Sequence, residues 1–402
     1  MKIAVLTSGI LPVPAVQGGA VENLIDFYLE YNDHHRLHDI TVYSVAHPAA
    51  RRHQALLSTV NHYYFIDTSS IKARMKRKIR EWQRVKGEYY NNFIEYYFEQ
   101  AYRHIQKNHY DYIIIENRPG YVCKLSLRGF SNLILHLHND NLHKDTPKAR
   151  IIFEHLKMVI TVSDYINQQV KTISNSHQSS ITKVVTVYNG INLQQFNKKE
   201  KTIVTRTNIG FTDNDFVVVY SGRLNKEKGI VHLIEAMLLL IDQPLIKLMV
   251  VGSTFFANST TEDPFILSLK EKAQPIKERI IFTGFVPYED MPDYLQLADI
   301  AVVPSICSEA FGLTVAEAQA MGLPTITTSQ GGIPEIVTPD SAIVLSTDKH
   351  FEQNLADAIR QLYNSPQQRA KMATAAQRNA VRYNKNDYAR DFFNTLGTLS
   401  PL

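Results

Sequence analysis

The strongest constraint on the fold of this chain is a regular alternation of short apolar runs with helical patterns, which occurs twice. The first series begins with KIAVLTS and ends with KVVTVYNG, and the second begins with FVVVYSG and ends with SAIVLST. A polar stretch, NLQQFNKKEKTIVTRTNIGFTDND, separates the two series. Strands that alternate with helices form parallel sheets joined by crossover helices. The sequence therefore predicts an α/β protein with two doubly wound, Rossmann-like domains.

Length and composition agree with two folded domains and set limits on the class of protein. The chain has 402 residues, more than the roughly 250 to 300 at which a single core stops growing. Its two cysteines, Cys123 and Cys307, exclude a disulfide framework and a cysteine zinc site. With no signal-like segment and no apolar run near the roughly 18 residues of a membrane span, we expect a cytoplasmic protein. The formal net charge of +4 gives no indication of a nucleic-acid partner.

One segment, residues 71–86, is strongly basic and also amphipathic. It contains eight Lys or Arg and one acid, Glu81, and its apolar residues recur at helical spacing: Ile71, Met75, Ile79, Trp82 and Val85. Such a helix can lie on an anionic membrane, as a peripheral contact on the inner face. The alternative is a surface helix that packs its apolar stripe on the core. We favour the alternative, because apolar stripes usually face the core.

The loop SGILPVPAVQGG follows the first apolar run and ends in Gly18-Gly19 before a helix. Ligands of parallel sheets bind beyond the carboxyl ends of the strands, and paired glycines let backbone N–H groups approach a phosphate there. The loop lacks the G-x-G-x-x-G pattern, and the second strand ends without an acid that could hold an NAD ribose. There is no Walker A sequence either, so the loop is compatible with phosphate binding but does not favour NAD binding or ATP hydrolysis.

The second series carries cations and carboxylates at equivalent places. Arg223 and Lys228 lie in SGRLNKEKG after its first strand, where they are suited to neutralise a diphosphate. Glu309 and Glu317 flank Gly312, where a helix is expected to begin, and eight helical residues span about 12 Å. Carboxylates in such a position can accept hydrogen bonds from vicinal hydroxyls. Alone, the pair would favour a solvated carboxylate at Glu309 and an ordinary helix residue at Glu317.

Taken together, the Gly-Gly loop, HLHND, SGRLNKEKG, EAFGLTVAEA and GGIPEIV closely resemble the retaining nucleotide-sugar glycosyltransferases of family four. The resemblance runs from Met1 to about residue 385, and LPVPAVQGGAVE is similar to spore-coat and cell-surface polysaccharide members. It implies the GT-B fold, two Rossmann-like domains that face a central cleft. We assign 1–192 to an acceptor domain and 193–384 to a donor domain. The helix in 385–402 is expected to cross back to the first domain.

The resemblance also implies roles for individual residues of the donor half. Arg223 and Lys228 would bind the diphosphate leaving group. Glu309 would hold the 3- and 4-hydroxyls of the sugar, and Glu317 would bind the ribose hydroxyls. The backbone N–H groups that assist Glu309 belong to Phe311, Gly312 and Leu313, and the base pocket would include Phe285 and Val286.

In the first half, the resemblance places Gly18 and Gly19 near the donor diphosphate or the acceptor. It places His138 near the C6 hydroxyl of the donor sugar and the reacting centre. We expect His136 on the opposite face of the strand, in a structural role. Asp140 and His143 are candidates for contact with the acceptor.

The implied reaction is the retaining transfer of a hexose from a nucleoside diphosphate sugar to a hydroxyl of a glycan or lipid-linked acceptor in surface polysaccharide synthesis. UDP is the expected nucleotide of the donor, by family frequency. The D-x-D string Asp213-Asn214-Asp215 precedes a strand and is interpreted as a turn, so neither metal nor cofactor is expected. The alternatives are a UDP-sugar epimerase of similar fold, a sugar phosphorylase and a non-catalytic partner subunit.

Overall fold

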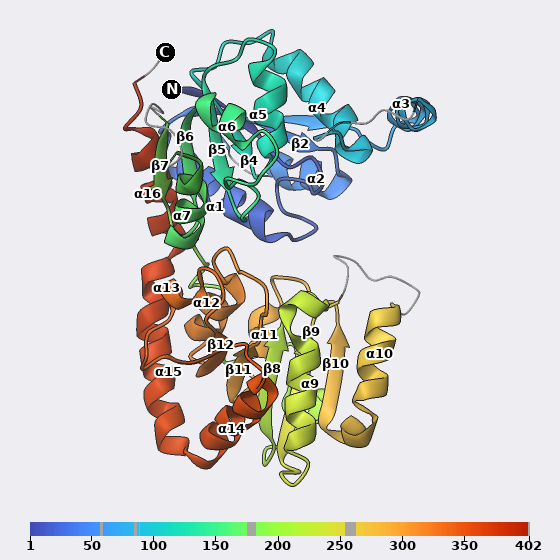
Figure 1. Ribbon diagram of the computed structural model, residues 1–402, viewed down its shortest axis with the longest axis vertical. Coiled ribbons are helices and arrows are strands. Elements are labelled where there is room, and N and C mark those ends of the chain that lie inside the picture. Colours follow the sequence, from blue (N-terminus) through green and yellow to red (C-terminus); the bar gives the residue numbers. More distant parts are fainter. Residues whose placement is uncertain (57–58, 84–86, 88, 175–181, 254–262, 401–402) are drawn as a thin grey trace. The chain divides into compact units, whose positions relative to one another are not determined.

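The structure is a computed structural model that describes residues 1–56, 59–83, 87, 89–174, 182–253 and 263–400. The chain divides into two compact units. The N-terminal domain comprises Met1–Gly190 with Lys385–Leu402, and the C-terminal domain comprises Ile191–Asn384. Each contains a parallel sheet with helices on both faces (Figure 1), so the α/β class with two Rossmann-like domains is confirmed.

The sheet of the N-terminal domain has the strand order β3-β2-β1-β4-β5-β6-β7, and every neighbouring pair is parallel. Its strands are β1 (Lys2–Leu6), β2 (Asp39–Val45), β3 (His62–Ile66), β4 (Tyr112–Glu116), β5 (Leu133–Leu137), β6 (Leu156–Thr161) and β7 (Lys183–Thr186). Its helices are α1 (Ala20–His35), α2 (Pro48–Leu56), α3 (Ile71–Trp82), α4 (Asn92–Ile105), α5 (Pro119–Ser126), α6 (Ala149–Glu154), α7 (Asp164–Ser174) and α16 (Lys385–Leu396).

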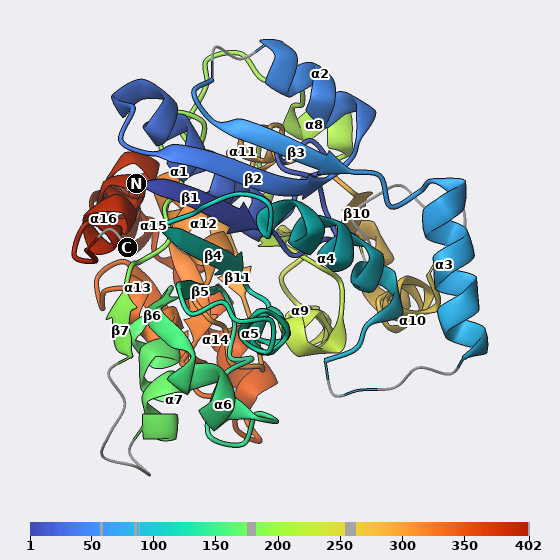
Figure 2. The ribbon, with the colours of Figure 1, turned by 90° about the horizontal axis from the view of Figure 1, so that it is seen from above.

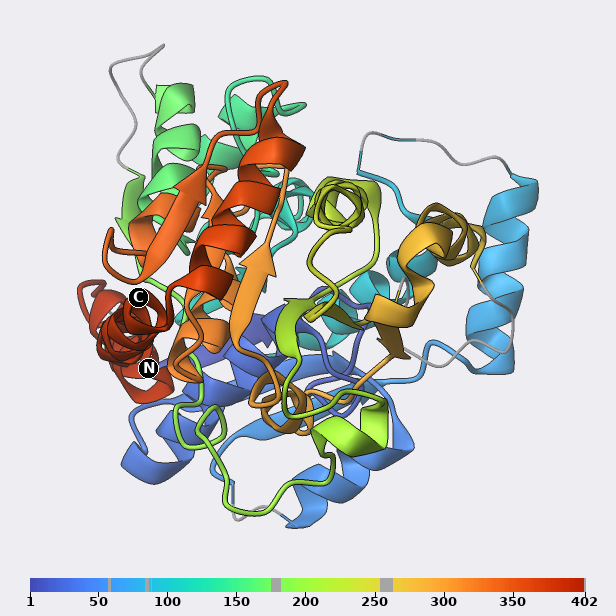
Figure 3. The same ribbon diagram turned by 90° about the horizontal axis from the view of Figure 1, so that it is seen from below.

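The C-terminal domain has the strand order β10-β9-β8-β11-β12-β13, again parallel throughout. Its strands are β8 (Phe216–Ser221), β9 (Ile246–Val251), β10 (Ile280–Gly284), β11 (Ile300–Val303), β12 (Thr325–Thr328) and β13 (Ala342–Leu345). Its α-helices are α8 (Arg206–Ile209), α9 (Ile230–Leu239), α10 (Pro264–Lys272), α11 (Met291–Leu295), α12 (Leu313–Ala320), α13 (Ile333–Ile336), α14 (Phe351–Asn364) and α15 (Pro366–Ala380). Three 3₁₀ turns are η1 (Lys226–Lys228), η2 (Gln274–Arg279) and η3 (Val381–Tyr383). Helices α9 and α14 lie side by side over one face of this sheet (Figure 3).

In both sheets the order of the strands reverses next to the first strand of the domain. The reversal falls between β1 and β4 in the N-terminal domain and between β8 and β11 in the C-terminal domain. Loops that leave the carboxyl ends of such strands diverge to opposite faces and leave a crevice in which ligands bind. The loops after these four strands are therefore the place to look for a site.

The last helix, α16, packs on the N-terminal domain, as the sequence predicted (Figure 2). Its apolar face is buried, and the ring of Phe392 stacks on that of Tyr28 in α1, with 4.5 Å between the centroids. Lys385 Nζ also donates to Glu30 Oε2 of α1 at 2.7 Å. The chain thus completes its first domain only after it has built the second.

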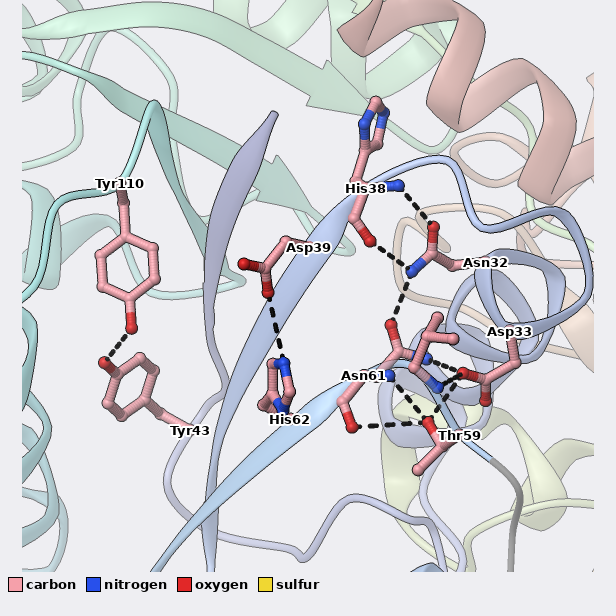
Figure 4. Close-up of polar contacts among 10 residues, drawn as sticks. Asn32, Asp33, His38, Asp39, Tyr43, Thr59, Asn61, His62 and Tyr110 are labelled. Carbon is pink, nitrogen blue, oxygen red and sulfur yellow. Dashed lines mark hydrogen bonds and ion pairs between the residues drawn. The ribbon is translucent and has the colours of Figure 1, made fainter.

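A buried polar network near the amino ends of β2 and β3 fixes α1 to the sheet (Figure 4). Asn32 Nδ2 donates to Asn61 Oδ1 at 2.8 Å and to the His38 carbonyl at 3.0 Å, and Asn61 Nδ2 donates to Asp33 Oδ1 at 2.7 Å. Thr59 Oγ1 donates to the same Asp33 oxygen at 2.7 Å. Because these groups satisfy one another at the end of the sheet opposite the ligand-binding loops, the network is structural.

The basic helix α3 does not pack as we predicted. Ile71 and Trp82 are both 84% exposed, Met75 is 57% exposed and Ile79 is 46% exposed, whereas Ala73 is buried. The favoured interpretation, an apolar stripe docked on the core, is therefore wrong. Residues 84–86 of the predicted segment, including Val85, lie outside the described residues.

Candidate active site

Lys228 and Glu309, predicted to bind adjacent parts of one ligand, form an ion pair in the C-terminal domain. Lys228 Nζ donates to Glu309 Oε1 at 2.5 Å, and Ser305 Oγ donates to the same oxygen at 2.6 Å. Lys228 ends the turn after β8, and Glu309 lies in the loop after β11, so the pair spans the reversal in strand order. Both side chains are only partly exposed, at 25% and 15%. A ligand anion that reached this point would compete with Glu309 for the ammonium group.

Two glycines hold the loops of this ion pair in place. A Cβ on Gly229 would lie 1.8 Å from the Pro304 carbonyl oxygen, and a Cβ on Gly331 would lie 2.1 Å from the Glu309 carbonyl oxygen. Both glycines have positive φ, of 73° and 61°. The Gly332 N–H also donates to the Glu309 carbonyl at 2.7 Å. The glycine pair of SQGGIPE thus fixes the backbone of Glu309.

Helix α12 begins directly after Gly312, which is its N-cap residue, with φ 99° and no side-chain cap. Helix N-termini carry partial positive charge and attract anions. The side chain of Phe311 is buried and meets Tyr383 edge-on at 5.4 Å between centroids, so it anchors the loop. Leu313 is the first residue of the helix. The predicted start of the helix at Gly312 therefore agrees with the structure.

Glu317 occupies the buried side of α12, at 6% exposure. Burial raises the pKa of its carboxyl to about 8, against the lowering effect of a hydrogen bond from Tyr288. Tyr288 lies in the same loop as Phe285 and the buried Val286, the residues predicted for the base pocket. Without a ligand, Glu317 is therefore mostly protonated at neutral pH. Sequence analysis had not singled out Tyr288.

Arg223, the other predicted cation, is exposed after β8, and its carbonyl accepts from Tyr220 Oη at 2.8 Å. The D-x-D string lies before β8, as predicted, and forms a turn. Asp215 Oδ2 accepts from the Thr212 N–H at 2.7 Å and from Thr212 Oγ1 at 3.0 Å. These bonds occupy the carboxylate in the manner of a turn.

In the N-terminal domain, the Gly-Gly loop closes over a buried acid. Gly18 and Gly19 have φ of 74° and 106°, and a Cβ on Gly19 would lie 2.3 Å from Glu22 Oε2. Glu22 is 5% exposed and accepts from Ser8 Oγ at 3.3 Å. Burial raises the pKa of Glu22. Space beside Gly18 is open, since a Cβ there would meet nothing within 4 Å.

His138 is held by a glutamate that sequence analysis had not assigned. Glu116, the last residue of β4, accepts from His138 Nε2 at 2.9 Å and from Tyr28 Oη at 2.9 Å. His136 Nδ1 also lies 3.1 Å from Glu116 Oε2. Our expectation that His136 lies on the opposite face from His138 is wrong, because side chains two residues apart in a strand share a face. Their rings lie 4.1 Å apart.

The electrostatics of this cluster fix the protonation of His138. Burial, together with His136, lowers the pKa of His138 to about 4. Although burial alone would raise the pKa of Glu116, the two histidines hold it well below its usual range. His138 is therefore neutral, with its proton on Nε2 facing the carboxylate. Its Nδ1 is buried and, among the described residues, has no hydrogen-bond partner, so it can accept from a ligand hydroxyl.

Asp140 and His143, the predicted acceptor residues, line one pocket of the N-terminal domain, of about 530 Å³. Tyr89, Tyr90 and Tyr121 contribute aromatic surface. The other lining residues are Asn91, Ile94, Asn117, Arg118, Pro119, Gly120, Asn141, Asp145, Thr146 and Pro147. The buried Nε of Arg118 has no hydrogen-bond partner within the described part of the chain. Aromatic faces beside amides and charges suit a polyhydroxylated ligand.

Two sets of side chains among the described residues bring three potential metal ligands within 4.8 Å of one another: Glu116, His136 and His138, and His232, Glu235 and Glu352. In both sets the groups already contact one another. His232 Nδ1 lies 2.6 Å from Glu352 Oε1, in the same way that His138 contacts Glu116. Their geometry is accounted for by these hydrogen bonds.

Comparison with known proteins shows what the second domain is similar to. Residues 203–379 match the family described as Glycosyl transferases group 1. The match covers most of the C-terminal domain, which is therefore similar to the glycosyl transferases of group 1. Over 392 residues, the chain is 26% identical to spore coat protein SA of Bacillus subtilis, and the match covers 94% of each chain.

Solved structures extend this likeness to the whole fold. Anabaena HepE in complex with UDP-glucose matches with a TM-score of 0.72 and 20% identity, over 99% of this chain and 100% of HepE. WaaG, a glycosyltransferase involved in lipopolysaccharide biosynthesis, matches with a TM-score of 0.65 and 15% identity, over 98% and 99% of the two chains. At these identities the likeness shows the fold, which is GT-B. The segment that matches the group 1 family thus lies in the second domain of a two-domain GT-B fold.

Proposed function

We propose that the protein transfers a hexose from a nucleoside diphosphate sugar to a hydroxyl of a glycan or lipid-linked acceptor in cell-surface polysaccharide synthesis. The expected nucleotide of the donor is UDP. The observation that carries this proposal is the ion pair of Lys228 with Glu309, within the segment that matches the group 1 family and beside the N-terminus of α12. The pair brings a cation and a carboxylate, a group that accepts from hydroxyls, within the length of one ligand, which supports the proposal.

In this proposal, the domain stabilises the charge that develops on the leaving group. As the bond from the anomeric carbon to the diphosphate breaks, negative charge builds on the β-phosphate. Arg223, Lys228 and the start of α12 are suited to stabilise that charge. Binding of the diphosphate by Lys228 frees Glu309 from the ion pair, and the carboxylate can then accept from the sugar hydroxyls.

Transfer proceeds with retention, through an oxocarbenium-like species on one face of the sugar. The acceptor oxygen forms the new bond to the anomeric carbon on the face that the diphosphate leaves. The leaving phosphate takes the acceptor proton, so no carboxylate serves as nucleophile, unlike in retaining glycosidases. Neutral His138, with Nε2 held by Glu116, can accept from a sugar hydroxyl through Nδ1. No metal ion or further cofactor takes part.

The pocket that contains Asp140 and His143 is the proposed site for the acceptor. Its tyrosines and amides are suited to a sugar ring, which presents apolar faces and hydroxyl edges. Gly18 and Gly19 begin the helix of the same domain, where they would contact the donor diphosphate or the acceptor. A lipid-linked acceptor agrees with a peripheral contact of residues 71–86 with an anionic membrane on the cytoplasmic side.

Release of nucleoside diphosphate from a panel of sugar nucleotides, with EDTA present, tests the proposal. We expect release with one donor in preference to the others. The substitution Lys228→Met should lower turnover about 10²- to 10³-fold, as does the loss of other preorganised charge-stabilising groups. The matched control is Lys226→Met, which removes an exposed lysine from the same turn and should change turnover less than twofold.

Product analysis separates the alternatives. An epimerase would convert the donor sugar without an acceptor, and a phosphorylase would need inorganic phosphate. A non-catalytic partner subunit would show no turnover with any donor or acceptor. If wild type and Lys228→Met behave alike across the whole panel, the proposed function is wrong.

A further inference from the structure

Helix α3 is attached to its domain by its polar side and turns its apolar side outward. Arg77 lies over the ring of Phe93 in α4, with 5.4 Å from the guanidinium carbon to the centroid, and Lys76 Nζ lies 5.7 Å from that of Tyr96. Asn92 Nδ2 donates to Glu81 Oε1 at 2.8 Å. An amphipathic helix on a protein core normally has the reverse orientation. Figure 1 shows α3 beside α4 and away from the sheet of its domain.

The outward side, which we term the α3 apolar face, consists of Ile71, Met75, Ile79 and Trp82. At 3.6 residues per turn these four side chains fall within an arc of about 80°. Their exposed fractions range from 46% to 84%. Phe93, at the start of α4, is also 71% exposed, but it lies under Arg77 on the polar side of α3 and does not belong to the α3 apolar face. Contiguous exposed apolar surface of this kind marks a site of interaction.

Basic side chains border the α3 apolar face on both sides. On the same helical projection, Lys72 lies at one edge, and Lys78 and Arg74 lie at the other. All three are exposed. The single acid of the helix, Glu81, accepts a hydrogen bond from Asn92 on the polar side of α3. A narrow apolar arc with cations at both edges suits a surface whose interior is apolar and whose boundary is anionic.

We infer that α3 is an interfacial helix that docks the N-terminal domain on a bilayer of anionic lipids. The α3 apolar face enters the boundary between headgroups and acyl chains, and Lys72, Arg74 and Lys78 contact the lipid phosphates. No helix among the described residues is long and apolar enough to cross a bilayer, so the contact is with one leaflet. Membrane binding by α3 does not depend on the proposed function. Only its biological purpose, access to a lipid-linked acceptor, rests on that function.

Trp82 is the only tryptophan of the chain, so its fluorescence reports on the docked face alone. Vesicles of phosphatidylcholine with 30 mol% phosphatidylglycerol are the probe, and pure phosphatidylcholine vesicles are the comparison. We expect the anionic vesicles to shift Trp82 emission to shorter wavelength and to sediment with the protein. Higher salt should weaken this binding because screening acts on the phosphate contacts.

Two variants separate the apolar and the electrostatic contributions. The double variant Ile71→Ser with Met75→Ser keeps Trp82 and should bind the anionic vesicles at least about tenfold more weakly. The triple variant Lys72→Glu, Arg74→Glu and Lys78→Glu should bind at least about a hundredfold more weakly, since each basic residue near the surface contributes about fivefold. Circular dichroism and the thermal midpoint verify that both variants fold.

The controls change equivalent exposed positions elsewhere in the N-terminal domain. Leu127→Ser removes an isolated leucine that is 87% exposed. Arg52→Glu, Lys107→Glu and Lys157→Glu together produce the same change in charge as the triple variant, at exposed positions outside α3. Both controls should bind anionic vesicles as wild type does.

Three results would overturn the inference: no shift of Trp82 emission with anionic vesicles, equal binding to both kinds of vesicle, or equal loss in variants and controls. A sedimentation mass that falls from dimer to monomer in the Ile71→Ser, Met75→Ser variant would assign the face to a second copy and would also overturn it. The donor panel, assayed without vesicles, tests the proposed function separately. Vesicle binding without release of nucleoside diphosphate from any donor of the panel would refute only the proposed function, and the converse would refute only the role of α3.

Discussion

Glu317 provides the sharpest prediction because its protonation and its proposed ligand are linked. The carboxyl is buried in α12 and its pKa is raised to about 8. At pH 7, one unit below that value, about a tenth of the molecules carry the carboxylate, so ionisation costs about 1.4 kcal/mol. If the carboxylate accepts from the ribose hydroxyls, donor binding must supply this free energy. The Kd for UDP-glucose should then fall about tenfold from pH 6 to pH 7 and level off above pH 8.

Titration calorimetry with UDP-glucose between pH 6 and pH 8.5 measures this dependence. In two buffers with different ionisation enthalpies, the heats at pH 7 should reveal the release of nearly one proton per donor bound. Glu317→Gln should abolish both the slope and the proton release and should bind more weakly than wild type at pH 8. Glu289→Gln is the control, since Glu289 is exposed and adjacent to Tyr288. A flat Kd in wild type, or an unchanged slope in Glu317→Gln, would refute the reasoning.

The same group makes the stability of the unliganded protein depend on pH. The folded pKa of about 8 lies above the ordinary value of 4.5. Burial of Glu317 is therefore tolerated best below pH 4.5, and stability is lost as the pH rises towards 8, by about 1.4 kcal/mol per unit within that window. Differential scanning calorimetry should show Glu317→Gln more stable than wild type at pH 8, with the advantage reduced at pH 5.

Three further predictions concern the positions around the site. Glu309→Gln should mainly lower kcat in steady-state assays, whereas Glu317→Gln should mainly raise the donor KM; equal effects on both constants would contradict their separate roles. Gly331→Ala should lower the free energy of unfolding by a few kcal/mol, and with it the thermal midpoint, because Gly331 has a positive φ and lies close to the Glu309 carbonyl oxygen. Gly18→Ala, with open space at its Cβ, should lower the free energy of unfolding by less. Glu116→Gln should lower kcat about tenfold at unchanged donor KM and shift the His138 ring resonances in NMR spectra, and a variant with unaltered resonances would rule out the positioning role.

Much of the fold could be predicted because the spacing of apolar residues and the order of strands and helices are local properties of the chain. The apolar runs at both β1 and β8 are buried on both faces, so they appear as continuous hydrophobic segments. Strand β3 (His62–Ile66) was not predicted. Within the described part of the chain it pairs with β2 alone, at the edge of its sheet, where His62 is exposed and the pattern HYYFI is weakly apolar.

The residues of the site could be nominated in the same way, since each follows a strand, but their contacts could not. Nothing in the spacing of Lys228 and Glu309 indicates that they meet at 2.5 Å, because the meeting depends on the parallel alignment of β8 with β11. For a similar reason the sequence indicated no role for Glu116: its carboxylate contacts His138 only because β4 pairs with β5. Tyr288 approaches Glu317 only after β10 and α12 have been placed in one domain.

By itself, the sequence determined the two α/β domains, the places where ligand-binding side chains collect and the amphipathic character of α3. Those features follow from the periods of side chains along strands and helices, which neighbouring residues set. Only the tertiary structure decided which way α3 turns and whether Glu317 is charged. Both depend on what surrounds a side chain. Helix α4 packs against the polar side of α3, so Trp82 stays exposed to solvent. The interior of the C-terminal domain excludes water from Glu317 and thereby raises its pKa.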